Sequence, residues 1–344
     1  MRNKTGKIQM KIEKKIFKAF RNITIFFITV ILLVSISGLI YERVGLYSDS
    51  KKYSVPGKIV KVNGHDMHVY AEGKGNLTVV FVSGSGTPSP YADFYPLYNE
   101  ISKYARIVVY ERPGYGYSEV TNTSRDIYTI TKEMHELLVK SGEKAPYILV
   151  GHSMGSLEVI RFAQMYKNEV KGIVMIEGGS PEFYANEEVD QNPISSMKLK
   201  SVLKNEGIMR LLFNYSKNFY KSAYSPRNQL ALVPLDLKNL DTAMYLKTMT
   251  NKNKTAELLN LKSNALIVNK NGNLGQIPLR ILTSDDEAKD SKWKNSQEAF
   301  KSWSTDSKQK IVNGSLHFIH QYKPNEVNSY IIEVINKVNY SCKK

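Results

Sequence analysis

The stretch Tyr147-Ile148-Leu149-Val150-Gly151-His152-Ser153-Met154-Gly155 decides the fold of this chain. Its first four residues form an apolar run that is typical of a buried strand, and residues 156–166 that follow are helix-like. On a tight turn between strand and helix, a serine can take a strained backbone conformation that exposes its hydroxyl, and flanking glycines let the two elements pass closely. The five-residue pattern is by itself weak evidence for such a turn, so the other motifs of the chain must be considered with it.

Other apolar runs repeat this alternation of strand and helix. The expected strands cover residues 57–62, 67–71, 78–82, 107–110, 147–150, 172–176, 279–282 and 309–312. Between them, residues 126–140 place apolar side chains on one helical stripe, and Asn63-Gly64 marks a hairpin turn between the first two strands. This order predicts an α/β fold, with a mostly parallel sheet, helices on both faces and an antiparallel hairpin at the edge.

One interval, at about residues 180–275, lacks strand signals. It contains Lys- and Asn-rich helical stretches instead, such as 195–212 and 237–247. An insertion at this point would lie over the carboxyl ends of the strands, where α/β sheets bind ligands. We therefore expect a helical cap within one globular domain over residues 57–341.

The N-terminus has a different character. Residues 1–22 contain eight Lys or Arg against the single Glu13, and residues 23–41 contain no charge. As a helix the apolar run would extend about 28 Å, which is enough to cross a bilayer. Because Lys and Arg favour the cytoplasmic side, we expect a cytoplasmic segment over 1–22, a single membrane anchor over 23–41, a linker over 42–56 and an extracytoplasmic domain. A cleaved signal peptide, and hence a secreted protein, is the alternative, since Ser35 and Ser37 have cleavage-like spacing.

Composition excludes several other classes. The first 22 residues supply +7 of the net charge of +16, and the rest is spread along the chain with no basic stripe interleaved with aromatic residues, so we expect membrane lipid rather than nucleic acid as a partner. The six histidines have no metal-ligand spacing, and Gly114-Tyr115-Gly116 lacks the third glycine of a dinucleotide site, so neither a metal nor a cofactor is expected. Cys342 is the only cysteine, which excludes an internal disulfide. The oligomeric state is not indicated.

Several motifs in order resemble the α/β-hydrolase superfamily over nearly all of residues 57–340. Gly151-His152-Ser153-Met154-Gly155 looks like its nucleophile elbow after the fifth strand. Ser83-Gly84-Ser85-Gly86 occupies the place of the usual His-Gly turn, and residues 111–118 resemble the D-x-x-G-x-G-x-S turn with Glu111 in place of Asp. The resemblance implies that Ser153 is the nucleophile of a serine hydrolase with a cap.

A serine nucleophile requires a base and an acid. His317 is the candidate base, because Gly314-Ser315-Leu316-His317-Phe318 follows the last expected strand as the superfamily's histidine loop does. For the acid, Glu177 at the end of the sixth strand matches the position used by haloalkane dehalogenases among others. The commoner position, after the seventh strand, holds Asp285, Asp286 and Glu287. We favour Glu177, with Asp286 or Asp285 as alternatives.

The backbone amides of Met154 and Ser85 are the expected donors of an oxyanion hole. A serine in place of an aspartate disfavours dehalogenation and epoxide opening, so the sequence predicts hydrolysis of a small-molecule carboxylic ester, or an amide, through an acyl-enzyme. An aminopeptidase resembling proline iminopeptidases is the alternative enzyme, suggested by the acidic residues Glu182, Glu187, Glu188 and Asp190 at the start of the cap. A ligand-binding protein that keeps this fold without catalysis is the alternative outside enzymes.

Overall fold

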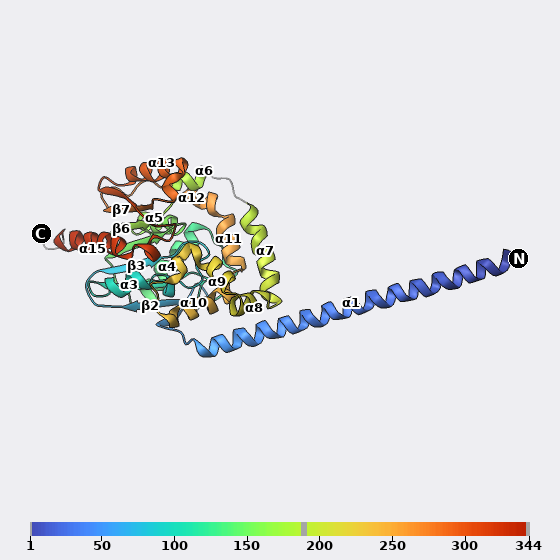
Figure 1. Cartoon of the computed structure of the whole chain (residues 1–344). Helices are drawn as coiled ribbons and strands as arrows, with labels where there is room; N and C mark the ends of the chain where they lie inside the picture. The colour runs from blue at the N-terminus through green and yellow to red at the C-terminus, as the bar shows by residue number, and fades with distance from the viewer. Residues whose placement is uncertain (1, 187–190, 342–344) are drawn as a thin grey trace.

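A computed structural model describes residues 2–186 and 191–341, and its centre is one eight-stranded β-sheet (Figure 1). Across the sheet the strands follow the order β1-β2-β4-β3-β5-β6-β7-β8. Their bounds are β1 Lys58–Val62, β2 His65–Glu72, β3 Thr78–Val82, β4 Arg106–Glu111, β5 Tyr147–His152, β6 Val170–Ile176, β7 Leu279–Ser284 and β8 Ser307–Val312. β2 pairs antiparallel with β1 and β4, and every other pairing in this sheet is parallel. The predicted fold class and edge hairpin are confirmed.

The pattern of burial explains this arrangement. Every residue of β3 and β5 is buried, as expected for strands that helices cover on both faces. At the hairpin, Asn63 and Gly64 have φ of 47° and 84°, the two positive values that a tight turn matching the strand twist requires.

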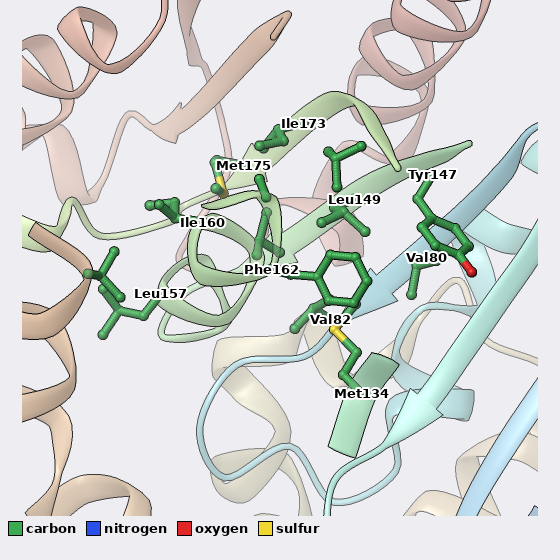
Figure 2. Packing of buried hydrophobic residues seen from close by; sticks show 14 of the residues in the cluster. Val80, Val82, Met134, Tyr147, Leu149, Leu157, Ile160, Phe162, Ile173 and Met175 are labelled. Carbon is green, nitrogen blue, oxygen red and sulfur yellow. The ribbon is translucent and has the colours of Figure 1, made fainter. Parts of the chain in front are cut away.

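Helices pack on both faces of the sheet. Their bounds are α2 Pro90–Asp93, α3 Tyr95–Ile101, α4 Ile127–Ser141, α5 Gly155–Met165, α13 Ser291–Phe300, α14 Ile319–Tyr322 and α15 Pro324–Ser341. On one face, Met134 of α4 and Phe162 of α5 pack with Val82 and Leu149 of the sheet (Figure 2). The side chains of α3 and α15 form a second core on the other face.

Helices also fill the interval between β6 and β7, which we call the helical insertion. They are α6 Pro181–Asn186, α7 Gln191–Asn205, α8 Ile208–Tyr215, α9 Lys217–Tyr224, α10 Leu235–Thr248, α11 Lys252–Leu259 and α12 Leu261–Lys270, with a 3-10 turn at Ser225–Leu230. Two hydrogen bonds hold the insertion against the loop after β4: Asn251 Nδ2 donates to Gly114 O at 2.8 Å, and Arg112 Nε donates to Glu257 Oε1 at 3.1 Å. The insertion therefore contacts loops at the carboxyl ends of the strands.

The N-terminal helix α1 spans Arg2–Lys52 and projects far from the domain (Figure 1). It is long and apolar enough to cross a membrane, a test that a signal sequence also passes. The segment over 42–56, expected as a linker, is helical as far as Lys52. The reason lies far along the chain: Arg210 of α8 donates to Glu42 at 2.9 Å and to Asp49 at 2.8 Å, which holds this polar segment as helix against the insertion.

Candidate active site

Ser153 lies on a strained turn between β5 and α5. Its φ is 51°, in the left-handed region that non-glycine residues rarely adopt, and its amide donates to Ile176 O of β6 at 3.1 Å. The flanking glycines are required sterically. A Cβ on Gly151 would lie 2.9 Å from Val159 Cγ2, and one on Gly155 would lie 2.7 Å from Ser83 O. The turn thus presents the partly exposed Ser153 at the carboxyl edge of the sheet.

His317 is the residue that meets this serine. Its Nε2 lies 3.0 Å from Ser153 Oγ, so the serine hydroxyl can donate to an unprotonated imidazole nitrogen. The structure therefore brings together the two residues that the sequence paired.

The neighbour of the serine holds the histidine loop in place. His152 is fully buried, and its Nε2–H donates to the backbone oxygen of His317 at 3.2 Å. Burial lowers the pKa of His152 well below its usual value, so this ring is neutral and carries one N–H. The sequence gives no sign of this contact, which makes His152 a positioning residue for the histidine loop.

Two glutamates lie near the base, in different settings. Glu287, in the 3-10 turn Glu287–Lys289 after β7, has Oε1 3.3 Å from His317 Nδ1. Glu177 follows β6 and is fully buried, and its two carboxylate oxygens accept from Ser284 N and Trp293 Nε1, both at 2.6 Å. Burial raises the pKa of Glu177 to about 7, although these donors and the charge of nearby His317 oppose the shift. The contact with Nδ1 is thus made by Glu287, which we had named only as a neighbour of the alternative acids.

The two alternative acids have other contacts. Asp285 accepts from the amides of Gly314 and Ser315 at 2.9 and 3.1 Å, which braces the start of the histidine loop and lowers the pKa of this carboxyl. Asp286 is exposed and pairs with Lys289 at 2.6 Å. Neither contact involves the imidazole.

The loop after β3 lies directly against the serine, since a Cβ on Gly84 would lie 2.9 Å from Ser153 Cβ. Arg112 Nη1 donates to Ser83 O at 2.8 Å and Nη2 donates to Gly84 O at 3.1 Å. Because C=O and N–H of a trans peptide point in opposite directions, the bond to Gly84 O turns the Ser85 amide away from Arg112. The Met154 amide lies at the start of α5, where helix N–H groups are free to bind an anion.

A model of the alpha/beta hydrolase fold matches residues 78–324 of the sequence. The chain belongs to the alpha/beta hydrolase fold family. This α/β hydrolase is 32% identical over 337 residues to the uncharacterized protein YbdG of Bacillus subtilis (strain 168), covering 94% of this chain and 99% of the relative.

Solved structures share the architecture at low identity. An epoxide hydrolase of Bacillus megaterium aligns with a TM-score of 0.60 at 16% identity, covering 81% of this chain and 100% of that one. The enol-lactonase of Burkholderia xenovorans LB400 aligns with a TM-score of 0.58 at 13% identity, with the same two coverages. At these identities the likeness shows the fold alone.

Sequence reasoning missed the buried charges beneath the loop of this α/β hydrolase. Besides the two carbonyls, Arg112 contacts Glu257 of α11 at 3.1 Å and Glu158 of α5 at 3.3 Å. Burial raises the pKa of Glu158 to about 7, while the Arg112 charge opposes that shift. The sequence feature that could have indicated these buried charges is Arg112, a charged residue within the turn formed by residues 111–118. Its partners lie too far along the chain to be inferred.

Tyr184 of α6 was missed as well. This buried side chain lies against Ser153, and a Cβ on Gly179 would lie 2.7 Å from the Tyr184 hydroxyl oxygen. Burial raises the pKa of Tyr184, so it remains a neutral hydroxyl. The insertion thus adds a polar group to the serine's surroundings.

The remaining histidine near the loop has a separate structural setting. His320 Nε2 lies 2.9 Å from Asp93 Oδ2, and both side chains are buried. Within residues 2–186 and 191–341, no group of three or more His, Cys, Asp or Glu side chains is arranged to hold a metal ion.

Proposed function

We propose that this chain is a serine hydrolase that cleaves a carboxylic ester, or less readily an amide, through an acyl-enzyme. The observation that carries the proposal is the 3.0 Å contact between Ser153 Oγ and His317 Nε2 on a strained turn. Serine is a poor nucleophile unless a base takes its proton during attack, and this contact provides that transfer.

The steps follow from the positions of these groups. Ser153 Oγ attacks the carbonyl carbon as its proton passes to His317 Nε2, and the oxyanion accepts from the amides of Met154 and Ser85. The imidazolium then protonates the leaving oxygen or nitrogen as its bond to the carbonyl carbon breaks. The alcohol or amine departs and the acyl group stays on Ser153. Water then attacks the acyl-enzyme as its proton passes to His317 Nε2. The imidazolium returns this proton to Ser153 Oγ, and the carboxylic acid leaves.

We propose Glu287 as the carboxylate that orients His317. Its oxygen lies within ion-pair distance of Nδ1, whereas the oxygens of Glu177 already accept two short hydrogen bonds. Glu177 is retained as the second candidate, because it is buried close enough to His317 for a charge on the imidazole to favour its ionised form.

A fluorophosphonate probe tests the chemistry directly, since it labels only an activated serine. Wild-type protein in detergent should be labelled, and Ser153→Ala should lose the label. Ser156→Ala is the matched control, because the Ser156 hydroxyl donates to Gly179 O at 2.7 Å instead of facing a base. Unlabelled wild type beside a labelled reference hydrolase would refute the enzyme and favour the non-catalytic binding protein.

The aminopeptidase alternative has little support from the described residues. Glu182 Oε1 accepts from Trp303 Nε1 at 2.9 Å, and Glu187, Glu188 and Asp190 lie outside those residues. Turnover of p-nitrophenyl acyl esters should exceed turnover of aminoacyl anilides. Activity on the anilides alone would reverse the assignment.

We further propose that residues 23–41 anchor the enzyme in the cell membrane, with residues 1–22 cytoplasmic and the helical insertion serving as a cap on the outer side. The positive flank and the uncharged run support this topology. External protease on intact cells should digest the domain, and a tag at residue 1 should stay protected and membrane-bound. A tag lost from the membrane fraction would favour the cleaved signal.

A further inference from the structure

α1 touches the helical insertion within the apolar run itself. A Cβ on Gly38 would lie 2.2 Å from Glu206 O, and one on Gly207 would lie 2.8 Å from Gly38 O. The two backbones are therefore in direct contact at the corner between α7 and α8. Because Gly38 belongs to residues 23–41, this corner lies level with the end of the expected membrane span.

The contact is fixed by polar side chains. Arg210 of α8 pairs with Glu42 and Asp49, and Asn214 Nδ2 donates to the Tyr41 hydroxyl at 3.0 Å. The side chains of Arg210 and Glu42 are only 7% and 4% exposed, so this pair is buried. A buried, doubly paired guanidinium holds the two helices in one orientation.

Figure 1 shows the consequence for the shape of the molecule. α7 runs across the direction of α1, on the side of the domain toward which α1 projects, whereas α3 lies on the opposite side. A bilayer spanned by α1 would therefore meet α7 and α8 before any other part of the domain.

These two helices expose large apolar side chains, which we call the α7–α8 surface. Its members are Leu199, Val202, Ile208, Leu211 and Tyr215, which are 61%, 59%, 40%, 46% and 81% exposed. Spacings of three and four residues keep those of each helix on one stripe. Exposed Lys198 accompanies them, as basic residues do in helices that lie in a membrane interface.

The other side of α7 borders the candidate site. A cavity of about 200 Å³ is lined by Ser85 and Gly86 of the oxyanion loop and by Met197 and Lys200 of α7. One helix thus separates the loop beside Ser153 from the α7–α8 surface.

We infer that the α7–α8 surface rests in the interfacial layer of the bilayer that α1 spans, and that the substrates are esters that partition into lipid. This inference rests on the proposed membrane anchor and hydrolase activity. Apolar side chains that water would otherwise surround are buried among headgroups and acyl chains, and Lys198 contacts anionic lipid. A lipid-dissolved ester then reaches the wall of the cavity without first crossing bulk water.

Depth-dependent quenching tests this placement in the full chain. With Cys342→Ser as background, the variants Leu211→Cys, Phe27→Cys and Tyr104→Cys are each labelled with a fluorophore, and each protein is reconstituted in phosphatidylcholine–phosphatidylglycerol vesicles with or without brominated acyl chains. Phe27 reports insertion of α1. Tyr104, which is 51% exposed, is the matched control because it follows shortly after α3, the helix that Figure 1 shows on the opposite side.

The labels at Leu211 and Phe27 should lose most of their fluorescence in brominated vesicles, and the label at Tyr104 should keep it. Quenching at Phe27 without quenching at Leu211 would overturn the surface while leaving the anchor intact. No quenching at Phe27 would overturn the anchor and with it the inference. Fluorophosphonate labelling of the same samples reports on Ser153 separately, so failure of the chemistry is distinguished from failure of the membrane contact.

Discussion

Replacing Arg112 with lysine is expected to slow ester hydrolysis about 10- to 100-fold without unfolding the protein. Lysine keeps a positive charge beside Glu158 and Glu257, but an ammonium lacks the planar fork that holds two carbonyls at once. Once the bonds to Ser83 O and Gly84 O are lost, the Gly84–Ser85 peptide is free to rotate. In the proposed mechanism, the Ser85 amide then no longer donates to the developing oxyanion.

The magnitude follows from the value of one oxyanion donor, about 3 kcal/mol of barrier lowering. Since each 1.36 kcal/mol is tenfold in rate, complete loss of the Ser85 donor gives about 100-fold and partial loss about tenfold. The donor acts mainly in the transition state, so kcat should fall while KM changes little.

Arg280 provides the matched control for this variant. It is as buried as Arg112, pairs with Asp306 and Glu333, and donates to two backbone carbonyls, but it lies on β7 away from the serine. The assay measures kcat and KM for a p-nitrophenyl ester, together with Tm, for wild type, Arg112→Lys and Arg280→Lys in one detergent. Unchanged kcat in Arg112→Lys, or an equal loss in Arg280→Lys, would refute this account of the loop.

The remaining predictions concern the acid, the pH dependence and the anchor. Glu287→Gln should lower kcat on p-nitrophenyl esters about 100-fold or more, because His317 loses the partner of Nδ1; a larger loss in Glu177→Gln would instead make Glu177 the acid. The raised pKa of Glu177, about 7 against 4.5 when unfolded, means that the folded state holds this proton more tightly, so stability is lost as pH rises from 4.5 to 7. In Glu177→Gln, the free energy of unfolding should fall by about 3 kcal/mol less than in wild type between pH 4.5 and 7, as measured by denaturation at several pH values. An equal dependence of this free energy on pH in both proteins would contradict the raised pKa of Glu177. Arg210→Met should destabilise the domain by about 3 kcal/mol, since Glu42 stays buried without its partner, and a Tm equal to wild type would argue against the docked helix.

Sequence alone could predict the contact between Ser153 and His317, because both residues follow strands of one parallel sheet. The carboxyl ends of such strands meet at one edge, so the order of the apolar runs determines which loops converge. The glycines around Ser153 also predicted the tight turn, because only glycine tolerates the close approach of Ser83 and Val159. The local motif around Ser153 and the order of the strands therefore both indicate the same site.

The partner of His317 could not be predicted in this way. Glu177 and Glu287 both lie at the same edge, and the choice depends on a 3-10 turn that directs Glu287 toward Nδ1 and on Trp293, which occupies one oxygen of Glu177. These are contacts between side chains from separate elements. Periodicity carries no information about them.

The helical course of residues 42–52 was missed for a similar reason. A polar, serine- and lysine-containing segment after a membrane span is typical of a linker, and its own sequence gives no reason for a helix to persist. The reason is Arg210, more than 150 residues away, which pairs with one face of that helix. Tertiary contact here outweighs local preference.

The hydrogen bond from His152 to the backbone of His317 makes one short segment, the end of β5, position both Ser153 and His317. His152, the last residue of β5 and the neighbour of Ser153, bonds the loop that carries His317, so separation of Ser153 from His317 requires that this hydrogen bond break at the end of the central strand. Heat inactivation should therefore coincide with the cooperative melting of the sheet instead of preceding it as a local loosening of the loop. Activity is then expected to persist until close to the melting temperature and to be lost over the same interval as the fold.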